Sequence, residues 1–256
     1  MKKEKKTPLK EKPLRLPGQS LDEERQRLFD KMDDIMFFPL ALALLAIMEW
    51  WHWYFKTPAD LKTAIIFSLF AMLTGVYATL RIRKLRKIRR QLSLGRDGER
   101  VVGQCLEELR IKGYRVLHDI VGEDFNIDHV VIGPTGIFTI ETKTVSKPRR
   151  GKTIVSFEGE KILLNGMSPD RDPLIQARAQ AAWVKGFLES STGKTFPVKP
   201  AVVCVGWFVE KMPKGFDVWV LNDTALPTFI VNEYGGLSPD DQQGVTYQLC
   251  QHIRAH

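Results

Sequence analysis

The stretch Asn126–Lys143, NIDHVVIGPTGIFTIETK, decides the fold of this chain. It contains two runs rich in β-branched and aromatic residues, 126–133 and 136–143, on either side of a Pro-Thr turn flanked by glycines. Such a pattern predicts two β-strands joined in a hairpin. Closing the hairpin between Pro134 and Thr135 brings Gly133 opposite Gly136. Because both strands are apolar on both faces, we expect a central hairpin rather than a solvated edge.

The same pairing brings Asp128 opposite Glu141, thirteen positions further along the chain. Directly opposed residues share a face, with their β-carbons about 5 Å apart. Lys143 follows Glu141 by two positions and joins that face. The alternative is that these charged residues face water near strand ends, or that a bulge breaks the register. Buried, unpaired carboxylates are costly, so we favour a divalent metal site.

On this interpretation Asp128 and Glu141 bind a divalent cation, and Lys143 lies beside the ion. Carboxylate oxygens suit hard divalent cations. A cation with an adjacent lysine is the minimal equipment for metal-assisted hydrolysis of a phosphodiester.

The net charge of +8 is unevenly distributed. Residues 1–94 carry 19 Lys and Arg against 10 Asp and Glu, whereas residues 95–256 carry 19 against 20. The basic excess therefore lies outside the part that contains the hairpin, and the whole-chain charge is no argument for nucleic-acid binding. The three cysteines are widely spaced and form no CxxC pair, which excludes a zinc ribbon.

The part of the chain with the basic excess also contains two apolar runs, 35–55 and 61–80. Each has about twenty residues, enough to span a hydrocarbon core of about 30 Å. Basic residues flank the pair: ten precede the first run, and seven lie within 81–90. By the positive-inside rule we expect a two-helix transmembrane hairpin in the inner or plasma membrane, with both termini in the cytoplasm. The alternative is a buried helical hairpin of a soluble protein.

The remaining segments predict the domain organisation. We expect a basic cytoplasmic arm at 1–34, with a short helix near 21–33, and a basic juxtamembrane linker at 81–94. In the soluble domain, 95–256, a helix at 97–112 precedes strands at 114–121, 126–133 and 136–143. A further hairpin at 153–164, a helix from 172, strands at 199–205 and 216–221, and a last helix from 238 follow. This order predicts an α/β domain with a mixed sheet.

This order of elements, with these residues in it, resembles a known family. The stretches GRDGERVVGQCLEEL, YRVLHDI, NIDHVVIGPTGIFTIETK and PLIQARAQ are similar to the nuclease-related domain (NERD), a branch of the PD-(D/E)XK nuclease superfamily. The resemblance covers roughly residues 95–210. It implies a restriction-endonuclease-like mixed sheet flanked by helices, and nuclease activity on nucleic acid, with DNA expected. Ile127 stands where the superfamily's namesake proline would be.

The resemblance also assigns site residues. It implies that Asp128 and Glu141 bind Mg²⁺, that Lys143 acts on the attacking water or the developing charge, and that an acidic residue of the preceding helix, here Glu99, joins them. Glu99 lies on the helix face that carries Val102 and Leu106. The alternative is that Glu99 is simply an acidic residue in the first turn of a helix, where its charge interacts favourably with the helix dipole. The family's similar glutamine points to Gln176, whereas Gln180 is expected only to border the core.

The basic run at 146–152 follows the strand that carries Glu141. Its Lys147, Arg149, Arg150 and Lys152 would contact phosphates beside the cut, or else form a solvated loop. The sequence thus favours a membrane-anchored, Mg²⁺-dependent nuclease, with nucleic acid and membrane lipid as partners. The main alternative is a non-catalytic scaffold that holds nucleic acid or a protein at the membrane, and a weaker one is a small-molecule phosphodiesterase.

Overall fold

The computed structural model describes residues 11–55, 61–122, 125–147, 153–158, 161–169, 171–213 and 216–255. The chain divides into two compact units. One combines the residues up to Gln19 with those from Leu94 onward, and the other is Ser20–Ser93.

The unit Ser20–Ser93 is a helical hairpin formed by α1 (Gln19–Tyr54) and the first part of α2 (Leu61–Glu107). The two helices contact each other through a small apolar cluster of Met32, Ile82 and Leu85. Further along, the indole nitrogen of Trp50 donates a 2.9 Å hydrogen bond to Ser68 Oγ.

Both helices are long and apolar enough to cross a membrane. Their apolar side chains are largely exposed, and Phe37 and Leu73 are 75% and 63% accessible. Such exposure is unlike the core helix of a soluble protein, whose apolar stripe is covered.

The helices are longer than the sequence pattern suggested. The short helix near 21–33 and the first apolar run form the single helix α1, which contains Pro39. The helix expected at 97–112 is instead the end of α2, continued by a 3₁₀ turn, η1 (Glu108–Lys112). Gly95 and Gly98 do not interrupt α2 because glycine is tolerated within a helix at a cost of about 1 kcal/mol.

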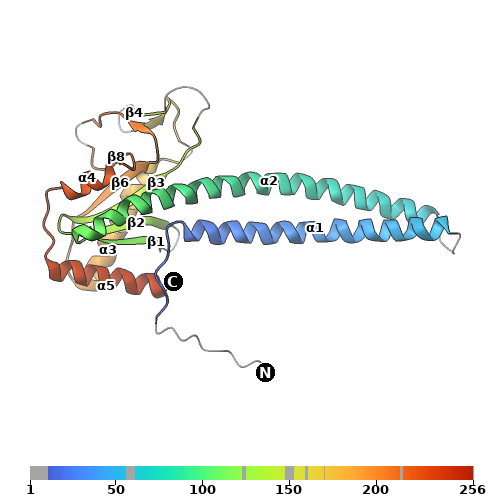
Figure 1. The fold of residues 1–256 in the computed structure, drawn as a ribbon, viewed down its shortest axis with the longest axis horizontal. Helices are drawn as coiled ribbons and strands as arrows, with labels where there is room; N and C mark the ends of the chain where they lie inside the picture. Colours follow the sequence, from blue (N-terminus) through green and yellow to red (C-terminus); the bar gives the residue numbers. More distant parts are fainter. Residues whose placement is uncertain are drawn as a thin grey trace. The chain divides into compact units, whose positions relative to one another are not determined.

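The other unit is an α/β domain, shown in Figure 1 with its elements labelled. Its main sheet has the order β1-β2-β3-β6-β8. The strands are β1 (Arg115–Val121), β2 (Asn126–Gly133), β3 (Gly136–Lys143), β6 (Val198–Cys204) and β8 (Trp219–Leu221). The first three pair antiparallel, whereas β6 pairs parallel with both β3 and β8. The expected mixed sheet is therefore confirmed.

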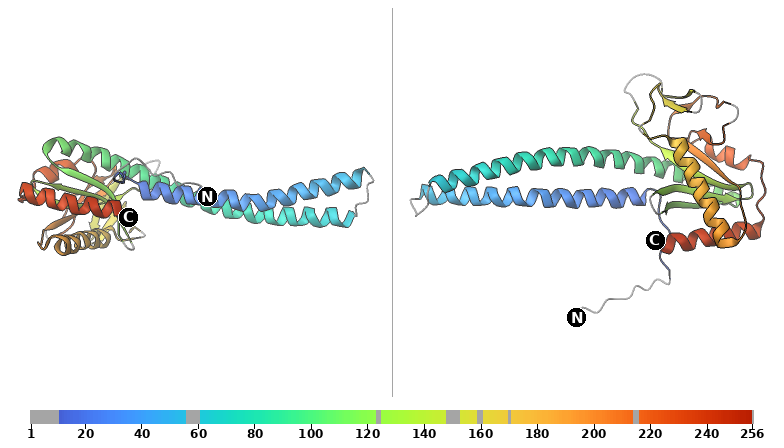
Figure 2. Two further views of the ribbon diagram at one scale, coloured as in Figure 1. Left: turned by 90° about the horizontal axis from the view of Figure 1, so that it is seen from below. Right: turned by 180° about the vertical axis from the view of Figure 1, so that it is seen from behind.

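Helices cover both faces of this sheet (Figures 1 and 2). On one face the end of α2, η1 and α4 (Leu226–Val231) bury an apolar core around Phe138. On the other face α3 (Pro173–Thr192) and α5 (Pro239–Ala255) pack on a second core that includes Ile132 and Ile137. Asp172 caps α3 by accepting a hydrogen bond from Leu174 N, with proline at the first turn, and the helix begins where the sequence predicted.

A second, three-stranded sheet has the order β5-β4-β7. It contains β4 (Ile154–Glu158), β5 (Lys161–Leu164) and β7 (Phe208–Val209). Its apolar side chains pack against the start of α3 and the neighbouring part of the main sheet.

Candidate active site

The β2–β3 hairpin has the predicted register. Gly133 pairs with Gly136, Val131 with Phe138, and His129 with Ile140. The next position in each strand is occupied by Asp128 and Glu141. There the backbone N–H of Thr142 donates a 2.6 Å hydrogen bond to Asp128 Oδ2. The turn that sets this register therefore brings the two carboxylates to the same end of the hairpin.

Glu141 is buried, with 6% of its surface exposed, and both of its oxygens accept hydrogen bonds. Lys143 Nζ lies 2.7 Å from Oε1. The same ammonium donates a 2.6 Å hydrogen bond to Gln176 Oε1 from α3. The structure thus brings together Glu141, Lys143 and Gln176, three of the predicted site residues.

Gln180 also belongs to this cluster. Its Nε2 lies 2.5 Å from Glu141 Oε2 and 3.1 Å from the carbonyl oxygen of Asn126. The expectation that Gln180 only borders the core is therefore wrong. Its place four residues after Gln176, one helical turn along the same face, was the signal in the sequence.

Glu99 lies in the part of α2 that belongs to the α/β domain and is 7% exposed. Burial, followed by the charges of Asp119 and Glu141, raises its pKa to about 8. The backbone N–H of Gly18 donates a hydrogen bond to its carboxylate and partly offsets this rise. Glu99 therefore lies near the other acidic residues, as the resemblance implied.

Burial and neighbouring negative charges also affect the pKa of Asp128. Burial raises its pKa well above the ordinary value, and the charges of Glu141 and Glu99 act in the same direction. The Thr142 N–H and the ammonium of Lys143 oppose this rise. Like charges that share a poorly solvated site favour the protonated form unless a cation compensates them.

Sequence reasoning missed Asp119 of β1. His118 pairs with His129 and Ile120 with Ile127, so Asp119 lies in register opposite Asp128. The backbone of Asp119 has a φ of 50°, which is unusual within a strand. Its carboxylate is 3% exposed and forms an ion pair with Arg15. No local periodicity distinguishes this aspartate from an ordinary strand residue.

The donor set fits Mg²⁺ or Mn²⁺ in its chemistry. Four carboxylates, those of Glu99, Asp119, Asp128 and Glu141, belong to this cluster, and ion pairs with Lys143 and Arg15 offset the charges of Glu141 and Asp119. A divalent ion would offset further negative charge when all four carboxylates are ionised.

The arrangement is not a ready-made metal cage. Among the described residues, no three His, Cys, Asp or Glu side chains are grouped closely enough to hold an ion. Lys143 and Gln180 each donate a hydrogen bond to one oxygen of Glu141, so a cation bound by that carboxylate would share these oxygens with the two donors.

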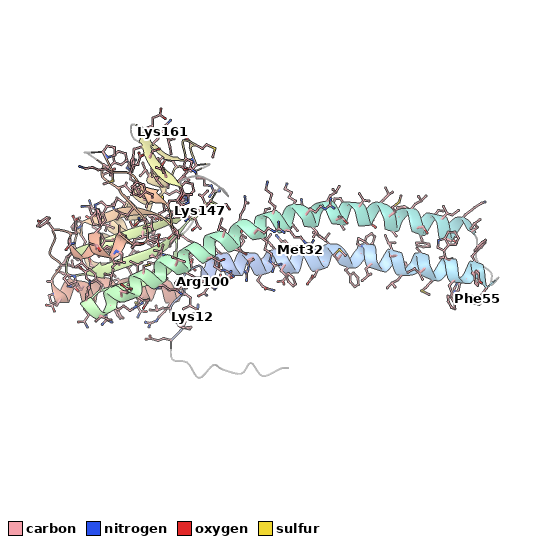
Figure 3. The ribbon with its side chains drawn as sticks, turned by 45° about the horizontal axis from the view of Figure 1, so that its top comes forward. Lys12, Met32, Phe55, Arg100, Lys147 and Lys161 are labelled. Carbon is pink, nitrogen blue, oxygen red and sulfur yellow. The ribbon has the colours of Figure 1, made fainter. Side chains whose placement is uncertain are left out.

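The predicted phosphate-binding loop is only partly described. Lys147 is exposed, and Figure 3 marks it together with Lys161 of β5. Arg149, Arg150 and Lys152 lie outside the described residues.

His129 points away from this cluster. It is fully buried, and its Nδ1 lies 2.8 Å from Nδ1 of His118. Burial lowers the pKa of both imidazoles. This geometry is that of a packed histidine rather than a general base.

Comparisons with known proteins support the resemblance. Residues 94–205 match the model of the family described as the nuclease-related domain, NERD. An uncharacterised protein of Bacillus anthracis is 43% identical over 54 residues, which are 19% of this chain and 26% of that protein. The chain therefore spans about a quarter of the length of this relative. No solved structure matches the chain.

Proposed function

We propose that this chain, whose residues 94–205 form a nuclease-related domain, is a membrane-anchored, metal-dependent nuclease that hydrolyses phosphodiester bonds of nucleic acid, with DNA as the expected substrate. The observation that carries the proposal is the cluster of Asp128, Glu141 and Lys143 at one end of the central hairpin. Glu99, buried nearby, extends the acidic set. A structural scaffold has no evident need for crowded carboxylates, which raise one another's pKa.

In the proposed reaction Asp128 and Glu141 would hold Mg²⁺ or Mn²⁺. The bound cation would supply Lewis acidity and make water a better nucleophile at neutral pH. Glu141 and Gln176 hold the ammonium of Lys143 beside the acidic cluster, where it would lie near the reacting phosphate. There it would stabilise the negative charge that develops on the phosphate oxygens, or take part in proton transfer.

Gln180 and Gln176 have supporting roles in this proposal. Gln180 fixes one oxygen of Glu141, and Gln176 orients Lys143. Both come from α3, whose N-cap and apolar face anchor it on the sheet. A rigid helix is a suitable support for groups that must be held precisely.

The membrane part of the proposal is supported by α1 and α2, which are long and apolar enough to span a bilayer. The basic flanks at 1–34 and 81–90 favour an orientation with both termini in the cytoplasm. The nuclease-related domain would then meet its substrate at the inner face of the membrane.

A second candidate is a non-catalytic scaffold that binds nucleic acid or a protein. Two observations favour it. Residues 95–256 carry one more acidic than basic residue, which is unusual for a protein that grips phosphates. In addition, Lys143 and Gln180 already satisfy both oxygens of Glu141.

The two candidates are separated by assaying the full chain in detergent micelles on single- and double-stranded DNA and RNA, with Mg²⁺, Mn²⁺ or EDTA. We expect Lys143→Ala to lower cleavage by about 10²-fold or more, the scale for loss of one group that transfers a proton or stabilises charge. Because lysine is not a Mg²⁺ ligand, metal binding should persist.

The matched control is Lys161→Ala, which removes an exposed lysine of β5 (Figure 3) and should cleave at the wild-type rate. If the wild type binds nucleic acid without cleaving it under every metal condition, and Lys143→Ala behaves identically, the scaffold candidate replaces the nuclease.

A further inference from the structure

The segment Glu11–Gly18, just before α1, packs on the nuclease-related domain. At its start Glu11 forms a 2.8 Å ion pair with Arg254 of α5. At its end the backbone N–H of Gly18 donates to the carboxylate of Glu99. Figure 3 marks Lys12 on this segment and Arg100 on the part of α2 near which the segment runs.

Two glycines make this close approach possible. A Cβ atom on Gly103 of α2 would lie 2.7 Å from Pro17 Cγ. A Cβ on Gly18 would lie 2.9 Å from Arg96 Cγ, and Gly18 also has a φ of 71°, which side chains rarely adopt. Both positions therefore need glycine while the segment is seated.

Between these contacts, Arg15 reaches the acidic cluster. Its Nε lies 2.6 Å from Asp119 Oδ2, and the two side chains are 13% and 3% exposed. Asp119 is the strand residue with the unusual φ of 50°, opposite Asp128. A strained residue beside a candidate site commonly marks a functional constraint rather than a defect.

We propose that residues 14–18 complete the active site of the nuclease-related domain, and that Arg15 is a positioning residue that acts through Asp119 to set the charge offered to the metal. This inference rests on the proposed function and goes beyond it. Arg15 offsets the charge of Asp119, so the cluster presents one negative charge fewer to the divalent ion. The site would therefore include residues 14–18 of the basic arm of the same chain. A fragment with residues 94–256 alone would lack them.

Removal of Asp119 and removal of Arg15 should change the Mn²⁺ affinity in opposite directions. Asp119→Asn removes one negative charge from the cluster and should weaken Mn²⁺ binding to the full chain by about threefold or more. Arg15→Gln removes one positive charge beside the cluster and should tighten Mn²⁺ binding by a similar factor. The double variant removes both charges and should return to within about twofold of the wild type.

The experiment is calorimetric Mn²⁺ titration of the full chain in detergent micelles. Arg15→Lys keeps the charge and should bind Mn²⁺ like the wild type. Lys12→Gln removes an exposed charge from the same segment and should change the affinity by less than about twofold. A merely structural role for Arg15 would not give opposed signs in the two single variants.

A second pair of variants leaves every charge in place. Gly103→Ala forces Pro17 away and should shift the Mn²⁺ affinity in the same direction as Arg15→Gln. Gly186→Ala in α3, where an added Cβ meets nothing within 4 Å, should not shift it. The inference is overturned if both single variants at the ion pair shift the affinity in the same direction, or if the double variant fails to restore it.

These outcomes are distinguishable from failure of the proposed function. Opposed affinity shifts without cleavage by the wild type would support the role of Arg15 and overturn the nuclease. Absence of Mn²⁺ binding by the wild type would overturn both.

Discussion

The side-chain nitrogen of Gln180 lies 2.5 Å from Oε2 of Glu141, and it joins the middle of α3 to the acidic end of β3. Both residues are buried, so water does not replace this hydrogen bond if it is lost. The contact links helix packing to the electrostatics of the candidate site.

Gln180→Met should therefore destabilise the metal-free protein by about 1–3 kcal/mol, because it leaves a buried carboxylate oxygen unpaired. Equilibrium urea unfolding of the full chain in micelles measures this. The control Gln104→Met, at an exposed glutamine of α2, should lower the free energy of unfolding by less than about 0.5 kcal/mol. An equal loss of stability in the two variants would contradict the role given to Gln180.

Metal binding should stabilise the wild type through linkage, by about 2.7 kcal/mol when free Mn²⁺ is a hundred times its dissociation constant. Glu141→Gln should abolish this gain, because it removes one of the two proposed carboxylate ligands. Thermal unfolding in Mn²⁺ and in EDTA measures this stabilisation, and Glu210→Gln, at an exposed glutamate, is the control. If Mn²⁺ still stabilised Glu141→Gln, the metal would bind elsewhere.

Glu99 gives a prediction about pH. Its pKa in the folded protein is about 8 against an ordinary 4.5, so the folded chain keeps a proton that the unfolded chain releases. In the metal-free wild type the contribution of Glu99 to the free energy of unfolding is therefore fully present below pH 4.5 and is lost as the pH rises towards 8.

Glu99→Gln cannot lose this proton, so its stability relative to the wild type should grow over the same window, by at most about 1.4 kcal/mol per pH unit. Urea unfolding in EDTA from pH 5 to 8.5 measures the difference. A constant difference across this range would show that Glu99 is ordinarily ionised in the folded protein.

The proposed topology has its own test. A reporter that is active only outside the cytoplasm should be silent when fused after residue 256 and active when inserted at residue 58, between the two apolar segments. The reverse pattern would overturn the orientation, and silence at both positions would contradict membrane insertion.

The sequence alone determined the central hairpin and its register. Pro134 and Thr135 at the turn, with glycine on each side, fix which residues pair, and the strand period of two then determines which side chains share a face. These are local rules, so the approach of Asp128 to Glu141 and Lys143 was readable from eighteen consecutive residues. The apolar lengths of α1 and α2 were equally readable, because a membrane span is a property of one continuous segment.

Tertiary structure decided how groups distant in the sequence contact the hairpin. Arg15 and Asp119 are 104 residues apart, and Gln180 is 39 residues from Glu141. No periodicity links such positions, because their meeting depends on how the sheet, α3 and the segment before α1 pack together. The chain thus specified its acidic hairpin locally, whereas the charge balance around that hairpin was set by packing between segments far apart in the sequence.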